Sequence, residues 1–253
     1  MSGLSDKIAF VSGASAGIGE ATARLLSAEG VKVIIAARRL ERLESLSKSL
    51  PSDCFKVELD VRDHDAVARV ISGLPPEWSE IDILVNNAGK ALGLSKLHEG
   101  DLDDWEEMID TNIKGLLYLS RAIIPGMVKR RRGHIINIGS IAGHQVYPNG
   151  NVYCGTKFAV SALSQGMMID LVDTPIRVSS VDPGLVETEF SQVRFHGDVE
   201  RASRTYQGYK PLEALDIAES VLWVASRPDH VQVAQMLVLP TAQAAASVLH
   251  KKS

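Results

Sequence analysis

The chain has 253 residues, of which 45% are hydrophobic and 23% charged, and its mean hydropathy of +0.03 is close to neutral. This composition can supply a sizeable core and argues against a disordered or membrane-embedded chain. The formal net charge of -4 and the sequence pI near 6.0 argue against nucleic acid as the main partner. Apolar runs fall short of the roughly 18 residues of a membrane span, and we see no signal segment, so we expect a cytoplasmic protein with no membrane partner.

Cysteine and histidine usage indicates neither a disulfide framework nor a metal site. The two cysteines, Cys54 and Cys154, are too few for such a framework and are typical of a reducing compartment. The seven histidines form no HExxH pattern, and the sequence has no CxxC pair, so we predict no metal site. We expect Cys154 to be a small buried residue of a helix rather than a reactive thiol.

Segments with the apolar character of buried strands alternate along the chain with segments of helical periodicity. The predicted strands cover 7–12, 31–37, 55–59, 81–85, 134–138, 176–181 and 236–239. The predicted helices cover 18–28, 40–50, 66–71, 101–132 with a break or kink at Pro125, 152–171 and 213–226. This alternation predicts an α/β fold with one doubly wound, seven-stranded parallel sheet and helices on both faces. Because no linker or internal repeat is visible, we interpret 1–253 as a single domain.

Two features predict helix ends. Asp101 is a candidate N-cap for the helix that follows it. The basic run from Lys129 to Arg132 precedes Gly133 and is typical of a helix C-terminus, where cations favour the dipole. Gly133 would then take the left-handed cap conformation. We prefer this interpretation to a nucleic-acid-binding patch.

The first predicted strand leads into a glycine-rich turn, SGASAGIG at 12–19, that opens directly into a helix. Gly13, Gly17 and Gly19 have the spacing Gly-x-x-x-Gly-x-Gly. Glycines in this place permit a tight turn, close approach of the backbone to a pyrophosphate and close helix packing, and the helix N-terminus favours an anion. Ligands of open parallel sheets bind beyond the carboxyl ends of the strands, so the turn is a candidate dinucleotide site.

The same turn also fits a second function class. Its central five residues match Gly-x-Ser-x-Gly, the nucleophile elbow of hydrolases, with Ser15 as the nucleophile. Such an elbow needs an upstream strand and loop for part of the oxyanion hole, and only fourteen residues precede Ser15. The hydrolase interpretation also leaves Gly19, Tyr153 and Lys157 without roles, so we rank it well below the dinucleotide site.

The second predicted strand ends in Ala36-Ala37-Arg38-Arg39. Enzymes for the unphosphorylated cofactor usually place an acidic residue here for the ribose hydroxyls, whereas arginine accommodates a 2′-phosphate. With two arginines and no acid, the sequence favours NADP over NAD. Two solvated arginines at the start of a helix would be the alternative, but cations there are slightly unfavourable to the helix dipole.

Tyr153 and Lys157 are four residues apart, so on a helix they share one face. A phenol has a pKa near 10 and becomes a useful acid or base at neutral pH only when a nearby cation stabilises its anion, and the Lys157 ammonium could do this. Ser140 follows the predicted strand 134–138, where its hydroxyl could hold a carbonyl oxygen. A Tyr-x-x-x-Lys pair alone is a weak signal because such pairs arise on many solvated helix faces.

In combination these residues resemble the classical short-chain dehydrogenase/reductases over nearly the whole chain. The motifs that carry the resemblance are the SGASAGIG turn, Asp60-Val61, Asn86-Asn87-Ala88-Gly89, Asn112, Ser140, Tyr153, Lys157 and Pro183-Gly184. The strings at 81–93, 183–195 and 238–245 are similar in particular to the branch of NADP-dependent 3-hydroxy acid dehydrogenases that act on serine and allo-threonine. The resemblance implies a Rossmann fold and NADP as the cofactor.

The resemblance also implies the roles of individual residues. Tyr153 would be the general acid/base, and Lys157 would lower its pKa and hold the nicotinamide ribose. Ser140 would orient the substrate oxygen, while Asn112 would position a water in a proton relay. The implied cofactor-binding residues are Gly13, Ser15, Gly17, Ile18, Gly19, Arg38, Arg39, Asp60, Val61, Asn87, Ala88, Gly89, Tyr153, Lys157, Pro183, Gly184, Val186 and Thr188.

The substrate side of the site is less defined by the sequence. A hydroxy acid needs a cation for its carboxylate, and Arg194 and Lys90 are the candidates. By resemblance, we expect a substrate lid at about 187–210 and a homotetramer. Two alternatives remain: a broad-specificity NADPH-dependent carbonyl reductase of ketones, aldehydes or keto esters, and a nucleotide-binding sensor. A sensor would have no use for an aligned Ser140, Tyr153 and Lys157.

Overall fold

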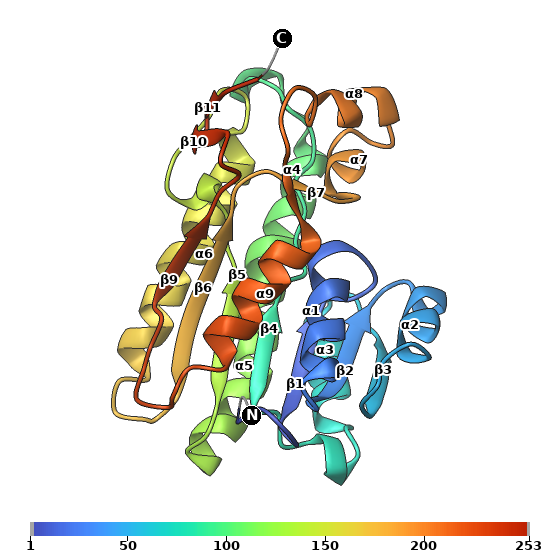
Figure 1. The fold of residues 1–253 in the computed structure, drawn as a ribbon, viewed down its shortest axis with the longest axis vertical. Helices are drawn as coiled ribbons and strands as arrows, with labels where there is room; N and C mark the ends of the chain where they lie inside the picture. The colour runs from blue at the N-terminus through green and yellow to red at the C-terminus, as the bar shows by residue number, and fades with distance from the viewer. Residues whose placement is uncertain (1–2, 252–253) are drawn as a thin grey trace.

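Seven parallel strands form one sheet through the centre of the molecule (Figure 1). The computed structural model describes residues 3–251. The strands are β1 (Ile8–Ser12), β2 (Lys32–Ala37), β3 (Cys54–Glu58), β4 (Ile83–Asn86), β5 (His134–Ile138), β6 (Arg177–Pro183) and β9 (Gln235–Val238). Their order is β3-β2-β1-β4-β5-β6-β9, so the chain changes direction across the sheet between β1 and β4. The predicted α/β class and the doubly wound, seven-stranded sheet are confirmed.

Helices cover both faces of the sheet (Figure 1). On one face, α1 (Gly17–Ala28), α2 (Leu40–Ser47) and α9 (Ala214–Ala225) contribute buried apolar side chains to the first core. On the other, α3 (His64–Ser72), α5 (Gly115–Arg130) and α6 (Asn151–Asp170) pack over the second core. Because each strand is buried on both faces, the strands appear in the sequence as continuous apolar runs rather than as alternating patterns.

Most of the remaining elements gather beyond the carboxyl ends of the strands (Figure 1). They include the helices α4 (Leu102–Ile109), α7 (Phe190–Arg194) and α8 (Val199–Arg204), and the short strand pairs β7 (Val186–Glu187) with β8 (Leu212–Glu213) and β10 (Gln243–Ala245) with β11 (Val248–Leu249). Single 3-10 turns lie at η1 (Pro76–Trp78), η2 (Leu97–Glu99) and η4 (Ile141–Gly143). Within residues 3–251, no helix has the length and apolar character needed to cross a bilayer.

The helix ends agree in part with the sequence. Asp101 caps α4 as predicted, since its side chain accepts hydrogen bonds from the backbone N–H groups of Asp103 and Asp104. The helix before Gly133 ends within the basic run, at Arg130 rather than at the predicted 132, and Arg131 instead of Gly133 takes the left-handed conformation, with φ of 53°. The glycine at 133 serves packing instead, because a Cβ there would come within 2.5 Å of the Met127 sulfur.

The predicted break at Pro125 is wrong. α5 continues through Pro125 to Arg130, with Ile123 and Met127 buried in the second core on either side of the proline. This packing holds the turn although the proline lacks an N–H donor. The irregular turn lies earlier, at the π-helical η3 (Asp110–Lys114) between α4 and α5, and it contains Asn112. Single π turns are frequent at functional sites.

Candidate active site

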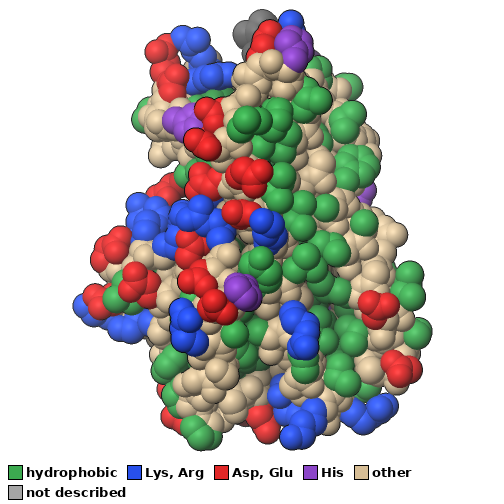
Figure 2. Space-filling model, turned by 180° about the vertical axis from the view of Figure 1, so that it is seen from behind, with side chains coloured by type: hydrophobic (Ala, Val, Ile, Leu, Met, Phe, Trp, Pro, Cys, Tyr) green, Lys and Arg blue, Asp and Glu red, His purple; other side chains and the backbone are tan. Residues whose placement is uncertain are grey.

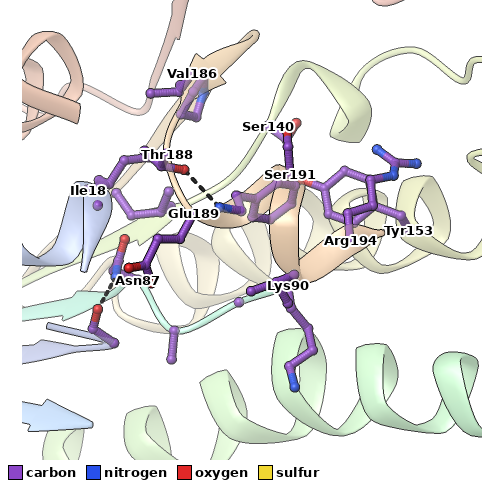
Figure 3. Close-up of a pocket in the computed structure, with 18 of the residues that line it drawn as sticks. Ile18, Asn87, Lys90, Ser140, Tyr153, Val186, Thr188, Glu189, Ser191 and Arg194 are labelled. Carbon is purple, nitrogen blue, oxygen red and sulfur yellow. Dashed lines mark hydrogen bonds between the residues drawn. The ribbon is translucent and has the colours of Figure 1, made fainter. Parts of the chain in front are cut away.

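A cavity of about 570 Å³ opens at the carboxyl ends of the strands, next to the point where the strand order reverses (Figure 3). Its size is in the range of cofactor and ligand sites, which span roughly 300 to 1,000 Å³. Most of the predicted site residues line it, although they come from segments far apart in the chain. These are Gly13, Ser15, Gly17, Ile18, Arg38, Arg39, Asp60, Val61, Asn87, Ala88, Gly89, Lys90, Ser140, Tyr153, Lys157, Pro183, Gly184, Val186, Thr188 and Arg194.

The glycine-rich turn has the form that a pyrophosphate requires. Gly13 and Gly17 have φ of 66° and 56°, a conformation that side chains other than glycine rarely adopt. The N-cap of α1, Ala16, provides no side-chain hydrogen bond, so the first amide groups of the helix are left for an anion. Gly19 does not line the cavity: a Cβ on it would lie 2.4 Å from the Gly13 carbonyl oxygen, so this glycine permits α1 to pack against the turn.

Arginines of the β2–α2 junction lie beside this turn. The Arg38 guanidinium lines the cavity and has no hydrogen-bond or ion-pair partner within residues 3–251. Arg39 donates from Nε and Nη2 to the Ser15 hydroxyl, at 3.2 and 3.0 Å, and from Nη1 to Glu189 at 3.0 Å. In the described part of the chain no histidine hydrogen-bonds Ser15, so the hydrolase alternative has no general base at this serine. The turn and its arginines together fit a phosphorylated dinucleotide.

Tyr153 and Lys157 are both buried on α6, one turn apart. Burial raises the pKa of the Tyr153 phenol, as does Tyr147, while a hydrogen bond from Ser140 and the charge of Arg194 act in the opposite direction. Burial lowers the pKa of Lys157 to about 8, and Asp182 opposes that shift. The Lys157 ammonium donates to the Ile138 carbonyl at 2.9 Å.

From the family resemblance, we predict that Lys157 lowers the pKa of Tyr153. In this structure Ser140 and Arg194 are the groups that act to lower this pKa, and the role assigned to Lys157 stays a prediction.

Of the two candidate substrate cations, only one faces the tyrosine. The Lys90 ammonium pairs with Glu107 at 2.6 Å and points away from Tyr153 (Figure 3). The Arg194 guanidinium carbon lies 5.7 Å from the Tyr153 ring centre and 5.5 Å from that of Tyr147. Arg194 donates from Nε to the Gly93 carbonyl, and within residues 3–251 it has no carboxylate partner. The N–H groups at Nη1 and Nη2 can therefore donate hydrogen bonds to an anion.

The comparisons with known proteins agree with this geometry. The pattern that defines the short chain dehydrogenases matches residues 7–198. The chain belongs to the short-chain dehydrogenase family. It is 47% identical over 242 residues to the NADP-dependent 3-hydroxy acid dehydrogenase of Escherichia coli strain K12, covering 95% of this chain and 98% of the relative. It is 42% identical over 257 residues to the protein of the same name from Schizosaccharomyces pombe strain 972, covering 100% and 99%.

A solved structure shares the fold closely. The closed form of serine dehydrogenase complexed with NADP+ matches this dehydrogenase with a TM-score of 0.93 and 46% identity, over 97% of this chain and 100% of the other. A crystal structure of serine dehydrogenase from Escherichia coli matches with a TM-score of 0.82 and 42% identity, over 94% and 99%. The family resemblance deduced from the sequence is thereby confirmed.

Asn112 lies behind the cavity wall of the dehydrogenase rather than in it. Its Oδ1 accepts from the backbone N–H of Lys90, and its Nδ2 donates to the Lys90 carbonyl, both at 2.8 Å. Nδ2 also donates to the Thr156 hydroxyl at 3.0 Å. Gly89 separates it from Lys157, since a Cβ on Gly89 would lie 3.3 Å from Asn112 Oδ1 and 3.7 Å from Lys157 Nζ. The π turn thus ties α4 and α5 to the strip after β4.

Three residues of the site were not found from the sequence. Asp182, which is buried, is the residue before the last in β6, and its negative charge favours a charged Lys157. Tyr147 carries Arg194 over its ring, and Glu189 binds Arg39. An acid at the end of an apolar strand was a usable signal for Asp182, whereas Tyr147 and Glu189 lie in segments without periodicity.

Proposed function

We propose that this protein is an NADP-dependent oxidoreductase that transfers a hydride between the cofactor and the 3-hydroxyl carbon of small 3-hydroxy acids. Serine, allo-threonine, 3-hydroxyisobutyrate and 3-hydroxypropionate are the substrates we expect. The observation that carries the proposal is the Arg194 guanidinium over the Tyr153 ring, a cation without a carboxylate partner in the described chain at the site of proton transfer. The near-full-length similarity to 3-hydroxy acid and serine dehydrogenases supports it.

The residues present fit NADP. The turn at 12–19 and the N-terminus of α1 would hold the pyrophosphate, and Arg38 with Arg39 would hold the 2′-phosphate. Ser12 locks this turn to the end of β4, because its hydroxyl accepts from the backbone N–H groups of Asn87 and Ala88 at 3.0 Å each. When bound, the nicotinamide supplies the hydride acceptor or donor, and the protein supplies orientation and electrostatics.

In this proposal the side chains move one proton and hold one carboxylate. The Tyr153 phenolate takes the proton of the 3-hydroxyl during oxidation, and the phenol returns it during reduction. Ser140 holds the substrate oxygen and donates the hydrogen bond that favours the phenolate. Lys157 holds the nicotinamide ribose, with Asp182 sustaining its charge, and Asn112 supports the proton relay. Arg194 fixes the carboxylate so that the 3-carbon faces the cofactor.

Replacing Arg194 tests the substrate class. Arg194→Met removes the charge and keeps an unbranched side chain, so we expect kcat/KM for 3-hydroxy acids to fall about tenfold to a hundredfold, as for loss of a charged hydrogen bond. Oxidation of neutral secondary alcohols should change less than about threefold because they have no carboxylate to bind. Initial rates with both substrate classes give the comparison.

The matched control for that experiment is Arg201→Met. Arg201 is another arginine of the lid, stacked at 4.4 Å on the Phe195 ring and outside the cavity lining. It should leave kcat/KM unchanged for both classes. An Arg194→Met enzyme with the wild-type KM for hydroxy acids would remove Arg194 from the substrate site and the acid preference from our proposal.

We also infer that the chain is one domain with its substrate lid at about 187–210, that it acts in the cytoplasm, and that it assembles as a homotetramer. Exposed apolar side chains on α5 and α6 support the assembly. Leu117, Phe158 and Ile169 are 38%, 43% and 72% exposed, and Figure 2 shows hydrophobic side chains gathered over the face seen from behind. Val160, on the same helix as Phe158 and Ile169, is buried in the protomer.

A further inference from the structure

An acidic residue, Glu189, binds Arg39, one of the two arginines proposed to bind the 2′-phosphate, and also Arg42. It follows Thr188 at the start of the lid and forms the N-cap position of α7. Its Oε2 accepts from Arg39 Nη1 at 3.0 Å, and its Oε1 accepts from Arg42 Nη1 at 2.5 Å. Glu189 lines the cavity and faces the side where Ile18 and Asn87 lie (Figure 3).

Arg39 has few N–H donors left for a second anion, because most of them already donate to other side chains. Nε and Nη2 donate to the Ser15 hydroxyl and Nη1 donates to Glu189, so three of the five N–H groups of this guanidinium are already used. A phosphate oxygen that binds Arg39 at Nη1 must displace the Glu189 carboxylate or lie beside it, and one that binds at Nη2 lies on the same guanidinium as the carboxylate. Two negative groups at ion-pair distance from one cation repel each other.

The charges around the site also indicate that Glu189 opposes binding of the 2′-phosphate. Arg38 and Arg39, the proposed phosphate ligands, contribute two positive charges, and Glu189 places one negative charge between Arg39 and Arg42. A 2′-phosphate carries about -1.5 to -2 near neutral pH. The hydrogen bond from Arg42, followed by that from Arg39, lowers the pKa of Glu189, so the carboxylate is ionised at neutral pH. Without this carboxylate Arg38 and Arg39 would attract the phosphate more strongly.

We propose that Glu189 is a specificity-determining residue that weakens binding of the 2′-phosphate and so limits the preference for NADP(H) over NAD(H). The inference rests on the proposed NADP site at Arg38 and Arg39. A cofactor without the 2′-phosphate has no charged group for Glu189 to repel. Any help that Glu189 gives to lid closure acts on both cofactors, so it cancels in the ratio of their dissociation constants.

Glu189→Gln tests the proposal because it keeps the shape of the side chain and removes its charge. The full-length protein is titrated with NADPH and with NADH in the absence of substrate, and each Kd is read from nicotinamide fluorescence. We expect the ratio Kd(NADH)/Kd(NADPH) to rise about threefold to tenfold, since two half-exposed ion pairs are lost. The gain should shrink at about 0.5 M salt, which screens exposed charges.

Two variants separate the charge of Glu189 from its place in the lid. Glu189→Asp keeps the charge, so its ratio should stay near that of the wild type. Glu187→Gln removes a charge two residues away on the same segment, where the side chain has no ion pair with Arg39 or Arg42 in the described structure. Its ratio should change less than about twofold.

The results also distinguish this inference from the proposed function. An unchanged or lower ratio in Glu189→Gln, with a strong NADPH preference in the wild type, would overturn the role of Glu189 alone. A wild-type ratio near one would overturn the proposed 2′-phosphate site, and this inference with it. Neither result depends on which substrate the enzyme oxidises.

Discussion

Tyr153→Phe should lower kcat by about 10²- to 10⁴-fold while NADPH binding stays within about twofold of the wild type. The range is that of a positioned general acid or base. Phenylalanine retains the ring that packs against Phe190 at 5.8 Å between centroids, so only the hydroxyl is lost. Single-turnover rates give the loss of chemistry, and fluorescence titration gives the cofactor affinity.

The pH dependence of kcat/KM provides a second test of the role of Tyr153. Oxidation needs the phenolate, whose population rises tenfold for each pH unit below the pKa of the phenol. Burial raises that pKa, so kcat/KM for oxidation should still be rising at alkaline pH in the wild type, and reduction should be favoured at lower pH. The residual rate of Tyr153→Phe should lack this rise.

Tyr118→Phe is the control for Tyr153→Phe. Tyr118 lies on α5, where its ring contacts His64 outside the cavity lining, and its hydroxyl should be dispensable for turnover. A Tyr153→Phe enzyme with more than a tenth of the wild-type kcat would remove the phenol from the proton transfer.

The second large effect concerns the cofactor. Arg38→Ala with Arg39→Ala should weaken NADPH binding by about two to four orders of magnitude and NADH binding by less than about tenfold. Each arginine would lose charged hydrogen bonds to the 2′-phosphate, worth roughly 1.5–3 kcal/mol apiece, which NADH does not make. Calorimetric titration with the two cofactors measures both values on the same protein.

NADH is the internal control for that double variant, because it shares the pyrophosphate and nicotinamide contacts. Arg39 also binds the Ser15 hydroxyl of the turn, so the small loss for NADH reports the disturbance of the turn itself. Equal losses for the two cofactors would mean that the arginines shape the turn and do not recognise the phosphate.

The fold could be predicted from the sequence because its main signals are local. Strands buried on both faces appear as apolar runs, and the turn at 12–19 requires glycines at positions where φ is positive. Local signals failed where packing decided the outcome. Pro125 stays inside α5, where residues on both sides are buried, and Arg131 takes the left-handed turn while Gly133 packs against Met127.

The sequence predicted which residues belong to the site better than it predicted which side chains contact one another. Most of the predicted residues line one cavity, but the sequence could not choose between Lys90 and Arg194, since the pairing of Lys90 with Glu107 is a tertiary contact. It could not show that Glu189 binds an arginine 150 positions earlier. Such pairings depend on how loops from different strand ends meet, and no periodicity records them.

The most direct test of the proposed function is the rate of NADP reduction at alkaline pH with L-serine, D-serine, L-allo-threonine, 3-hydroxyisobutyrate and 3-hydroxypropionate. NADPH oxidation with neutral ketones and aldehydes is measured beside it. We predict a clear preference in kcat/KM for the hydroxy acids that disappears in Arg194→Met. Turnover confined to neutral carbonyl compounds would contradict the account and identify the protein as a broad carbonyl reductase.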